Sequence, residues 1–359
     1  MSSVPEPCNV FDFEQLAEQR LEPGAFGYFA GGAGDERTLR ENVEAYGRWQ
    51  LRPRVLTGVE RADTRTTVLG TEVSMPLLVA PVAFQRMAHP EGESATARAA
   101  AAAGTIMVLS TLATSTPADV AAAAPNGRRW FQLYCFRDPG VTRALIDQAR
   151  DAGFDAIVLT VDAPRLGRRE RDLRTLFQIP ADVTVPSFAA AVGGSSAGTP
   201  ADMFAEMDGT VTWRSLEQLA AQAGMPVLVK GVITGEDAHL ACEHGAAGIV
   251  VSNHGGRQLD GASATIEALP EVVDAVRGRL EVLVDGGIRR GADVVKALAL
   301  GAQAVLAGRA VLWGLAADGE QGVRRVLELL NDEIELALVL TGCDSPGALT
   351  RAHVQRATR

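Results

Sequence analysis

Residues 227–256 read VLVKGVITGEDAHLACEHGAAGIVVSNHGG, a stretch that holds one complete strand–helix–strand unit. Val227–Lys230 and Gly248–Ser252 are short β-branched runs, whereas Glu236–His244 between them has the composition of a helix. Each run is apolar up to its last residue rather than alternating. The stretch therefore predicts two strands of a parallel sheet whose two faces are both buried.

The same alternation continues in both directions from this unit. Further strands are expected at Leu77–Val82, Ile106–Ser110, Trp130–Phe136, Ala156–Val161, Val282–Asp285 and Ala304–Ala307. Helices are expected between or after them, at Glu91–Ala103, Pro117–Ala124, Pro139–Ala152, Thr212–Ala223, Thr265–Arg279, Ala292–Leu300 and Val323–Leu340. Eight strands that alternate with eight helices predict an α/β fold, a single (β/α)8 TIM barrel.

Two segments lie outside this alternation within the single domain expected over residues 1–359. Residues 1–76 are expected to decorate a barrel of residues 77–345, with helices at Phe11–Gln19 and Glu36–Tyr46. A hairpin of Thr66–Val68 and Val73–Ser74 is expected to cap the bottom of the barrel. Residues 163–209 form a long insertion after the fourth strand, with small residues at 189–198. A connection of this length predicts a lid or a mobile segment.

Composition narrows the classes of partner and compartment. The 34 Lys and Arg against 44 Asp and Glu give a net charge of −10, which disfavours nucleic-acid binding. The four cysteines form no C-x-x-C pair, so neither a disulfide framework nor a zinc site is expected. The first residues lack a basic region followed by an apolar run, and no apolar run reaches the roughly 18 residues of a membrane span. We therefore expect a cytoplasmic protein without a metal or a membrane partner.

Barrel enzymes carry their chemistry at the carboxyl ends of the strands. The polar residues at these ends are Gln132, Tyr134, Thr160, Asp162, Lys230, Ser252, Asn253, His254, Asp285 and Arg309. A carboxylate, an ammonium, an imidazole and a guanidinium on one rim can shift one another's pKa values. This set of residues predicts an active site at that rim.

The segment Ser252–Asp260 is the most informative of these strand ends. His254 can act as a base near neutral pH, its following glycines allow close approach of a planar ligand, and Arg257 suits a carboxylate. Asp285–Arg289 and Ala307–Arg309 combine glycines with an arginine after neighbouring strands, a pattern that favours a phosphate site. Lys230 has two interpretations, a cation that stabilises a bound anion or an amine that forms a Schiff base.

Motifs distributed over nearly the whole chain carry a family resemblance: Tyr28–Ala33, Met87–Glu93, Phe131–Tyr134, Leu159–Asp162, Leu166–Glu170, Lys230–Gly231, Ser252–Asp260 and Asp285–Gly287. In these motifs the chain resembles the FMN-dependent 2-hydroxy acid oxidases and dehydrogenases, which include glycolate, lactate and mandelate enzymes. The resemblance implies bound FMN and oxidation of an (S)-2-hydroxy acid to the 2-oxo acid. It also implies a homo-oligomer, a tetramer.

The resemblance also implies a role for each site residue. His254 would be the catalytic base with Asp162 as its partner, and Tyr134 would hydrogen-bond the substrate. Tyr28, Arg169 and Arg257 would bind the substrate carboxylate. The residues matching the FMN site are Ala83, Ser110, Gln132, Thr160, Lys230, Ser252, Asp285, Gly287, Arg289, Gly308 and Arg309, with Lys230 near N1 and the C2 carbonyl.

Two positions depart from glycolate oxidase. Leu112 stands where that enzyme has a tryptophan against the substrate side chain, and Phe136 replaces a tyrosine. The smaller residue at position 112 predicts room for a bulkier substituent, such as an aryl group. The sequence shows no haem domain before the barrel and no apolar membrane segment in the insertion, which favours molecular oxygen as the electron acceptor and hydrogen peroxide as its product. The carboxyl terminus carries no peroxisomal signal, which agrees with a cytoplasmic location.

Three alternatives stay open at this point. The first is a dehydrogenase that passes electrons to a quinone or another acceptor. The second is a lyase that uses Lys230 as a Schiff-base amine, and the third is a catalytically silent flavin-binding protein. Because every catalytic position of the resembled family is filled, the third is the weakest.

Overall fold

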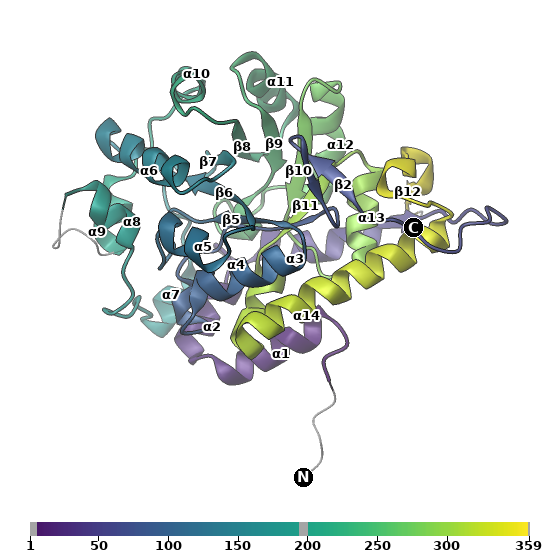
Figure 1. The fold of residues 1–359 in the computed structure, drawn as a ribbon, viewed down its shortest axis with the longest axis horizontal. Coiled ribbons are helices and arrows are strands. Elements are labelled where there is room, and N and C mark those ends of the chain that lie inside the picture. Colours follow the sequence, from purple (N-terminus) through teal and green to yellow (C-terminus); the bar gives the residue numbers. More distant parts are fainter. Residues whose placement is uncertain (1–5, 194–199, 358–359) are drawn as a thin grey trace, which may run out of the picture.

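The computed structural model describes residues 6–193 and 200–357 and contains a closed barrel of eight parallel strands (Figure 1). The strands are β4 (Leu77–Val79), β5 (Ile106–Leu109), β6 (Arg128–Leu133), β7 (Ala156–Thr160), β8 (Val227–Val232), β9 (Gly248–Val251), β10 (Glu281–Asp285) and β11 (Ala304–Ala307). Neighbouring strands pair in chain order, and β11 closes the barrel against β4. The prediction of a (β/α)8 barrel is confirmed.

The helices that surround the barrel begin and end close to the predicted positions. They are α4 (Gly92–Ala102), α5 (Pro117–Ala123), α6 (Pro139–Asp151), α10 (Trp213–Gln222), α11 (Gly235–Glu243), α12 (Thr265–Val276), α13 (Gly291–Ala299) and α14 (Arg309–Thr341). The largest difference is in α14, which the sequence placed from residue 323 onward. This helix begins at Arg309 and kinks at Asp318 and Gly319. The first part of α14 was not predicted because it contains glycines, which are weak helix formers. Gly314 and Gly322 are needed there because they let the two arms of the helix approach more closely than a Cβ would allow.

A short hairpin closes the amino end of the barrel. Strands β2 (Thr66–Val68) and β3 (Thr71–Val73) pair antiparallel, as predicted, although β3 ends one residue earlier than expected. Val68 and Val73 are buried in the same cluster as the inward-facing strand residues Leu78 and Trp130. Apolar side chains therefore fill this end, which leaves the opposite, carboxyl end for a ligand.

The amino-terminal segment forms α1 (Val10–Arg20), α2 (Pro23–Ala30), α3 (Arg37–Glu44) and the 3₁₀ turn η1 (Ala45–Arg48). Helix α1 packs along α14, and Asn9 caps it by accepting from the backbone N–H groups of Phe11 and Asp12. The sequence did not predict α2, whose eight residues carry two glycines and no polar face. It also did not predict the pairing of β1 (Trp49–Leu51) with β12 (Val354–Arg356), because three-residue strands carry little pattern. The short turns η4 (Pro346–Ala348) and η5 (Arg351–His353) precede β12.

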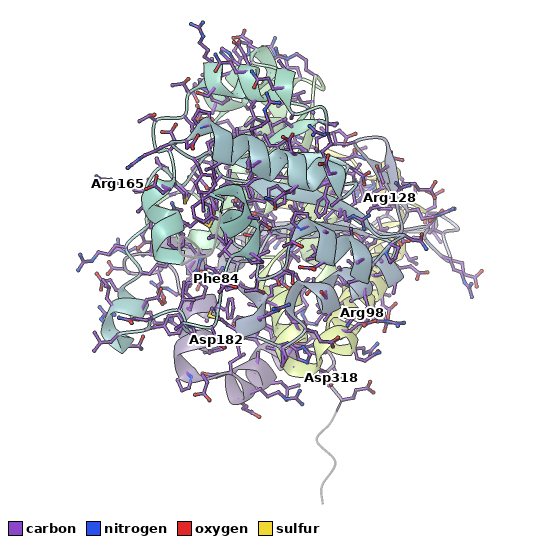
Figure 2. The ribbon with its side chains drawn as sticks, turned by 60° about the vertical axis from the view of Figure 1, so that its left-hand side comes forward. Phe84, Arg98, Arg128, Arg165, Asp182 and Asp318 are labelled. Atoms are coloured by element: carbon purple, nitrogen blue, oxygen red, sulfur yellow. The ribbon has the colours of Figure 1, made fainter. Side chains whose placement is uncertain are left out.

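The long insertion after β7 contains three short helices, α7 (Glu170–Thr175), α8 (Pro186–Ala191) and α9 (Pro200–Glu206). Part of the small-residue run expected to be mobile, residues 194–198, lies outside the described residues. Figure 2 labels Arg165 and Asp182 of the insertion, and also Phe84 of the loop after β4, which is fully buried. The insertion therefore brings additional side chains to the loops that follow the strands. No helix among the described residues is long and apolar enough to cross a membrane.

Candidate active site

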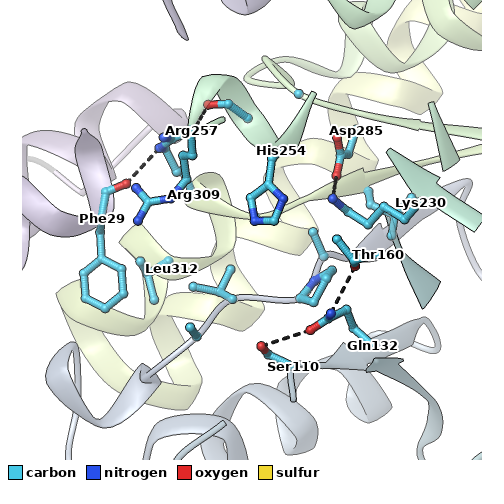
Figure 3. A pocket seen from close by; sticks show the side chains of 18 of the residues that line it. Phe29, Ser110, Gln132, Thr160, Lys230, His254, Arg257, Asp285, Arg309 and Leu312 are labelled. Carbon is cyan, nitrogen blue, oxygen red and sulfur yellow. Dashed lines mark hydrogen bonds and ion pairs between the residues drawn. The ribbon is translucent and has the colours of Figure 1, made fainter. Parts of the chain in front are cut away.

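The carboxyl ends of the strands surround a pocket of about 1110 Å³, which includes the solvent at its open mouth (Figure 3). All of the site residues predicted from the sequence line this pocket except Asp162, Ser252 and Asn253. Asp162 and Ser252 lie directly behind lining residues, whereas the Asn253 side chain is hydrogen-bonded to Asn42. Residues from all eight strand ends, the end of α2 and the insertion meet here. The barrel geometry thus gathers side chains that are up to 284 positions apart in the chain, from Tyr28 to Leu312.

His254 and Asp162 form a hydrogen-bonded pair at the edge of the pocket. The Nδ1 atom of His254 lies 2.8 Å from Oδ1 of Asp162, and both side chains are largely buried. An ionised carboxylate can only accept, so Nδ1 carries the proton and Nε2 keeps its lone pair. His254 also adopts a left-handed backbone with φ of 59°, which few residues with a Cβ adopt. Local strain of this kind is common where a side chain must be aimed at a ligand.

The pKa values of this pair suit a base and its partner. Burial lowers the pKa of His254 below its ordinary value, although Asp162 opposes that shift. Burial alone raises the pKa of Asp162, but His254 and Lys230 together bring it below its ordinary value. At neutral pH the pair is therefore a neutral imidazole beside a carboxylate, in which the carboxylate stabilises the imidazolium formed by proton uptake.

Two arginines flank Tyr28 on the neighbouring wall. The guanidinium carbons of Arg257 and Arg169 lie 4.9 Å and 5.7 Å from the centre of the Tyr28 ring. Burial, followed by the charge of Arg169, lowers the pKa of Arg257 to about 10. The Nε atom of Arg169 is buried without a hydrogen-bond partner among the described residues. Two adjacent cations with spare donors make a site for a carboxylate.

Lys230 occupies the opposite side of the pocket, where it is almost wholly buried. Its Nζ atom lies 3.1 Å from Oδ2 of Asp285 and donates to Oγ of Ser252 at 2.8 Å. Burial alone lowers the pKa of Lys230, but Asp285 and Asp162 raise it above its ordinary value. A Schiff-base lysine requires a neutral amine, so this environment disfavours the lyase interpretation.

A row of small and polar side chains forms the wall that follows β5, β6 and β7. Gln132 Oε1 accepts from Oγ of Ser110 at 3.3 Å, and Gln132 Nε2 donates to Oγ1 of Thr160 at 3.0 Å. These two bonds fix the orientation of the Gln132 amide. Ala83, with only a methyl group, extends the wall at the end of β4. The wall therefore has room and fixed polar groups for a planar ring.

The far end of the pocket suits a phosphate. Arg289 is buried there. Gly308 is the N-cap residue of α14, and no side chain caps the free N–H groups in the first turn of this helix. A Cβ at Gly287 would lie 1.8 Å from the Asn42 carbonyl oxygen, so the approach of α3 itself requires glycine. The Arg309 guanidinium, in contrast, donates to backbone carbonyls, which leaves its backbone N–H for an anion.

The pocket residues therefore fit FMN, the cofactor that the resemblance implies. The anion end suits the phosphate, and the wall of small polar groups together with the buried cation Lys230 suits the flavin ring. Oδ1 of Asp285 is buried without a partner among the described residues, although it lines the pocket. A ribityl hydroxyl or a ring N–H is the kind of donor that would satisfy it.

Sequence reasoning predicted Leu112 and Ala83 but missed other apolar residues of the lining. These include Phe29, Ala163, Leu166, Phe204 and Leu312, which come from α2, the insertion and α14. Their residue types carry no chemical signal, and α2 itself was not predicted. The only available indication was the length of the insertion, which did predict a segment that faces the site.

Comparisons with known proteins agree with this geometry. Residues 17–356 match the family model described as FMN-dependent dehydrogenase. Glycolate oxidase 1 of Zea mays is 51% identical over 354 residues, covering 97% of this chain and 96% of the relative. Glycolate oxidase 5 of Oryza sativa subsp. japonica is 52% identical with the same coverage. A mandelate oxidase structure with 3,3-difluoro-2-hydroxy-3-phenylpropionic acid has a TM-score of 0.90 and 45% identity, covering 98% of this chain and 100% of that chain.

Proposed function

The chain belongs to the FMN-dependent dehydrogenase family, and from this membership we propose how its pocket selects and oxidises a substrate. The protein is an FMN-dependent oxidase that converts a 2-hydroxy acid and oxygen into a 2-oxo acid and hydrogen peroxide. The observation that supports the proposed mechanism best is the convergence of His254, Arg257 and Lys230 on one pocket (Figure 3). A base, a carboxylate anchor and a cation for an anionic ring are the three groups that this oxidation needs.

The arginines bind and orient the substrate. Arg257 and Arg169 hold the carboxylate, while Tyr134 donates a hydrogen bond from its hydroxyl to the substrate hydroxyl or carboxylate. Burial raises the pKa of Tyr134 above its ordinary value, so this hydroxyl keeps its proton. Fixing the acid at one end places its C2 atom at the base, which contributes to the rate through orientation.

His254 then removes a proton from the substrate through Nε2. Asp162 stabilises the imidazolium that results, because the carboxylate lies 2.8 Å from Nδ1. FMN, when bound, supplies the acceptor for the two electrons that leave the substrate carbon and passes them to oxygen. Lys230 keeps a positive charge beside the ring, where it stabilises negative charge. The proton that His254 removes comes from either the hydroxyl group or C2, and both routes use this geometry.

We further propose that the substrate carries an apolar substituent larger than that of glycolate. Leu112 is buried at the pocket, and Leu166, Ala163 and Phe204 of the insertion add apolar surface to the same pocket. An aliphatic or aryl side chain would fill space that glycolate leaves empty, with a gain of about 25 cal/mol per Å² of apolar area buried. Among the relatives, two mandelate oxidase structures are described with (S)-mandelic acid and with 3,3-difluoro-2-hydroxy-3-phenylpropionic acid, and the plant enzymes are described as glycolate oxidases.

Changing Leu112 to Trp tests this substrate proposal. Wild-type protein is expected to show higher kcat/KM for lactate, 2-hydroxyoctanoate or mandelate than for glycolate. Leu112→Trp is expected to shift the preference by about tenfold or more toward glycolate, because the indole fills the space for the substituent. Assays of all four acids with oxygen measure this shift. Leu336→Trp, at an exposed position of α14, is the matched control.

An unchanged order of preference in Leu112→Trp would contradict the role of Leu112 and assign selectivity to the insertion. A wild type that prefers glycolate would contradict the substrate proposal itself. Neither result would affect the assignment of FMN chemistry.

Subunit number and location are proposals made from the sequence. We propose a homotetramer located in the cytoplasm. Exposed apolar side chains, including Val55 and Leu56 in the loop beside the end of α14, support self-association. Light scattering of the purified protein measures the mass, and cell fractionation measures the location. A monomer, or a protein recovered with an organelle, would contradict the respective proposal.

A further inference from the structure

Arg309 makes three hydrogen bonds to backbone carbonyls, although it lies at the end of the pocket that suits phosphate. Nε donates to Phe29 at 2.9 Å (Figure 3). Nη2 donates to Gly31 at 2.8 Å and Nη1 to Gly255 at 2.9 Å. Its backbone belongs to the first turn of α14, directly after β11. One side chain from the start of α14 thus joins two separate segments of the active site.

The first of these segments is the carboxyl end of α2. Arg257 donates through Nη1 to the carbonyls of Tyr28 and Gly31, so Gly31 accepts from both arginines. The negative end of a helix dipole favours such cations, and the two guanidinium groups satisfy carbonyls that the helix leaves free. The position of the Tyr28 ring, and of Arg257 over it, therefore depends on this shared attachment.

The second segment is the turn that carries the base. Gly255 directly follows His254, and both residues adopt left-handed backbone conformations, with φ of 63° and 59°. The Gly256 carbonyl accepts from the backbone N–H of Ala33 at 2.8 Å, so this turn is also bound to the residues after α2. The Arg309 bond to Gly255 therefore restrains the peptide adjacent to the catalytic histidine.

We propose that the Arg309 side chain is a positioning residue for His254 and Arg257 and does not bind the cofactor phosphate through its guanidinium. Its three carbonyl bonds set the distance between the base and the carboxylate anchor. Misplacement of a reacting group by about 1 Å can cost a factor of about 10² in rate. The inference rests on the roles of His254 and Arg257 in the proposed function.

Arg289 offers the matched comparison within the same pocket. It is more buried than Arg309, and the only hydrogen bond of its side chain among the described residues is from Nη1 to the carbonyl of the preceding Ile288. A salt bridge at 3.8 Å to Glu14 leaves further donors of this guanidinium available. Arg289 is therefore the side chain expected to bind phosphate.

The experiment compares Arg309→Lys with Arg289→Lys in the full-length protein. The first measurement is the affinity for FMN and for riboflavin, because the ratio of the two reports contacts to the phosphate. Arg309→Lys is expected to keep the wild-type ratio within about threefold, whereas Arg289→Lys is expected to reduce it by about tenfold or more. The riboflavin comparison requires no catalytic turnover.

The second measurement is anaerobic flavin reduction by a 2-hydroxy acid at saturating FMN. Arg309→Lys is expected to lower the rate constant by about 10- to 100-fold and to weaken binding of the 2-oxo acid product, because one ammonium cannot hold three carbonyls. Arg279→Lys, at an exposed position outside the pocket, is the control and is expected to reduce flavin at the wild-type rate.

Two results would overturn the proposal. A loss of FMN preference in Arg309→Lys as large as that in Arg289→Lys would identify Arg309 as a phosphate ligand. If Arg309→Lys reduced its flavin at the wild-type rate and bound the 2-oxo acid product with wild-type affinity, Arg309 would have no positioning role. Arg309→Gln provides the same measurements if the lysine variant does not accumulate as folded protein. Absence of flavin reduction in wild-type protein would instead refute the proposed function.

Discussion

Replacing His254 with Gln is expected to slow anaerobic flavin reduction by about 10²–10⁴-fold while FMN stays bound, because general base catalysis contributes a factor of that size. The glutamine amide can still donate toward Asp162, but it has no basic nitrogen in place of Nε2. The histidine contributes to the substrate side of the pocket, so flavin affinity is expected to change little. Stopped-flow absorbance under nitrogen measures reduction, and a separate mixing with oxygen measures reoxidation.

The control for this variant is His239→Gln, at an exposed position of α11 outside the pocket. This change is expected to leave both rates unaffected. If His254→Gln reduced its flavin at nearly the wild-type rate, another residue would have to be the base. A defect in reoxidation alone would also contradict the role assigned to His254.

The pH dependence of reduction follows from the state of the same imidazole. Burial lowers the pKa of His254, so the active neutral form is already populated at pH 7. The rate is therefore expected to be nearly constant from pH 7 upward. It should fall by tenfold per pH unit below the pKa, which lies below about 6.5. This acidic limb is expected to disappear in His254→Gln.

Replacing Arg257 with Lys is expected to weaken substrate binding by about 10- to 100-fold, with FMN affinity changed by less than about threefold. Arg257 uses Nη1 for the carbonyls of Tyr28 and Gly31, which leaves the rest of its fork for the substrate carboxylate. The single ammonium group of a lysine cannot bind both these carbonyls and the substrate carboxylate. The loss corresponds to one charge-assisted hydrogen bond, worth about 1.5–3 kcal/mol.

Substrate affinity is measured from the concentration dependence of anaerobic reduction, and FMN affinity from fluorescence on dilution. Arg279→Lys, at an exposed position after α12, is the control for the chemical change. Equal losses of affinity for substrate and FMN would mean that Arg257 mainly supports the structure of the pocket.

The barrel was predictable because each of its strands is buried on both faces and therefore reads as a short apolar run. All eight strands lie within about two residues of the predicted bounds at either end, except for the carboxyl ends of β4 and β6, which are three residues shorter. Helix α2 was not predictable, since its glycines and aromatic residues give no amphipathic pattern and neighbouring segments stabilise it. The early start of α14 was not predictable for a related reason. Its glycines suggest a turn, but in the structure they allow two arms of the helix to pack closely together.

The polar part of the site was predictable because barrel topology places strand ends together, whatever their separation in the chain. The direction in which each of these side chains points was not predictable. The sequence places Arg309 beside a phosphate motif, yet its guanidinium is directed to three carbonyls that only the folded chain brings within reach. The apolar lining from the insertion was also missed, since residues such as Phe204 and Leu166 carry no chemical signature.

The most direct test of the account is to mix the purified protein with a 2-hydroxy acid in the absence of oxygen and follow its flavin absorbance. We expect the protein to contain noncovalent FMN, which should bleach with at least one of glycolate, lactate, 2-hydroxyoctanoate and mandelate. Admission of oxygen should restore the absorbance and yield one hydrogen peroxide per 2-oxo acid formed. A protein that failed to bind added FMN, or whose bound FMN did not bleach with any 2-hydroxy acid, would contradict it.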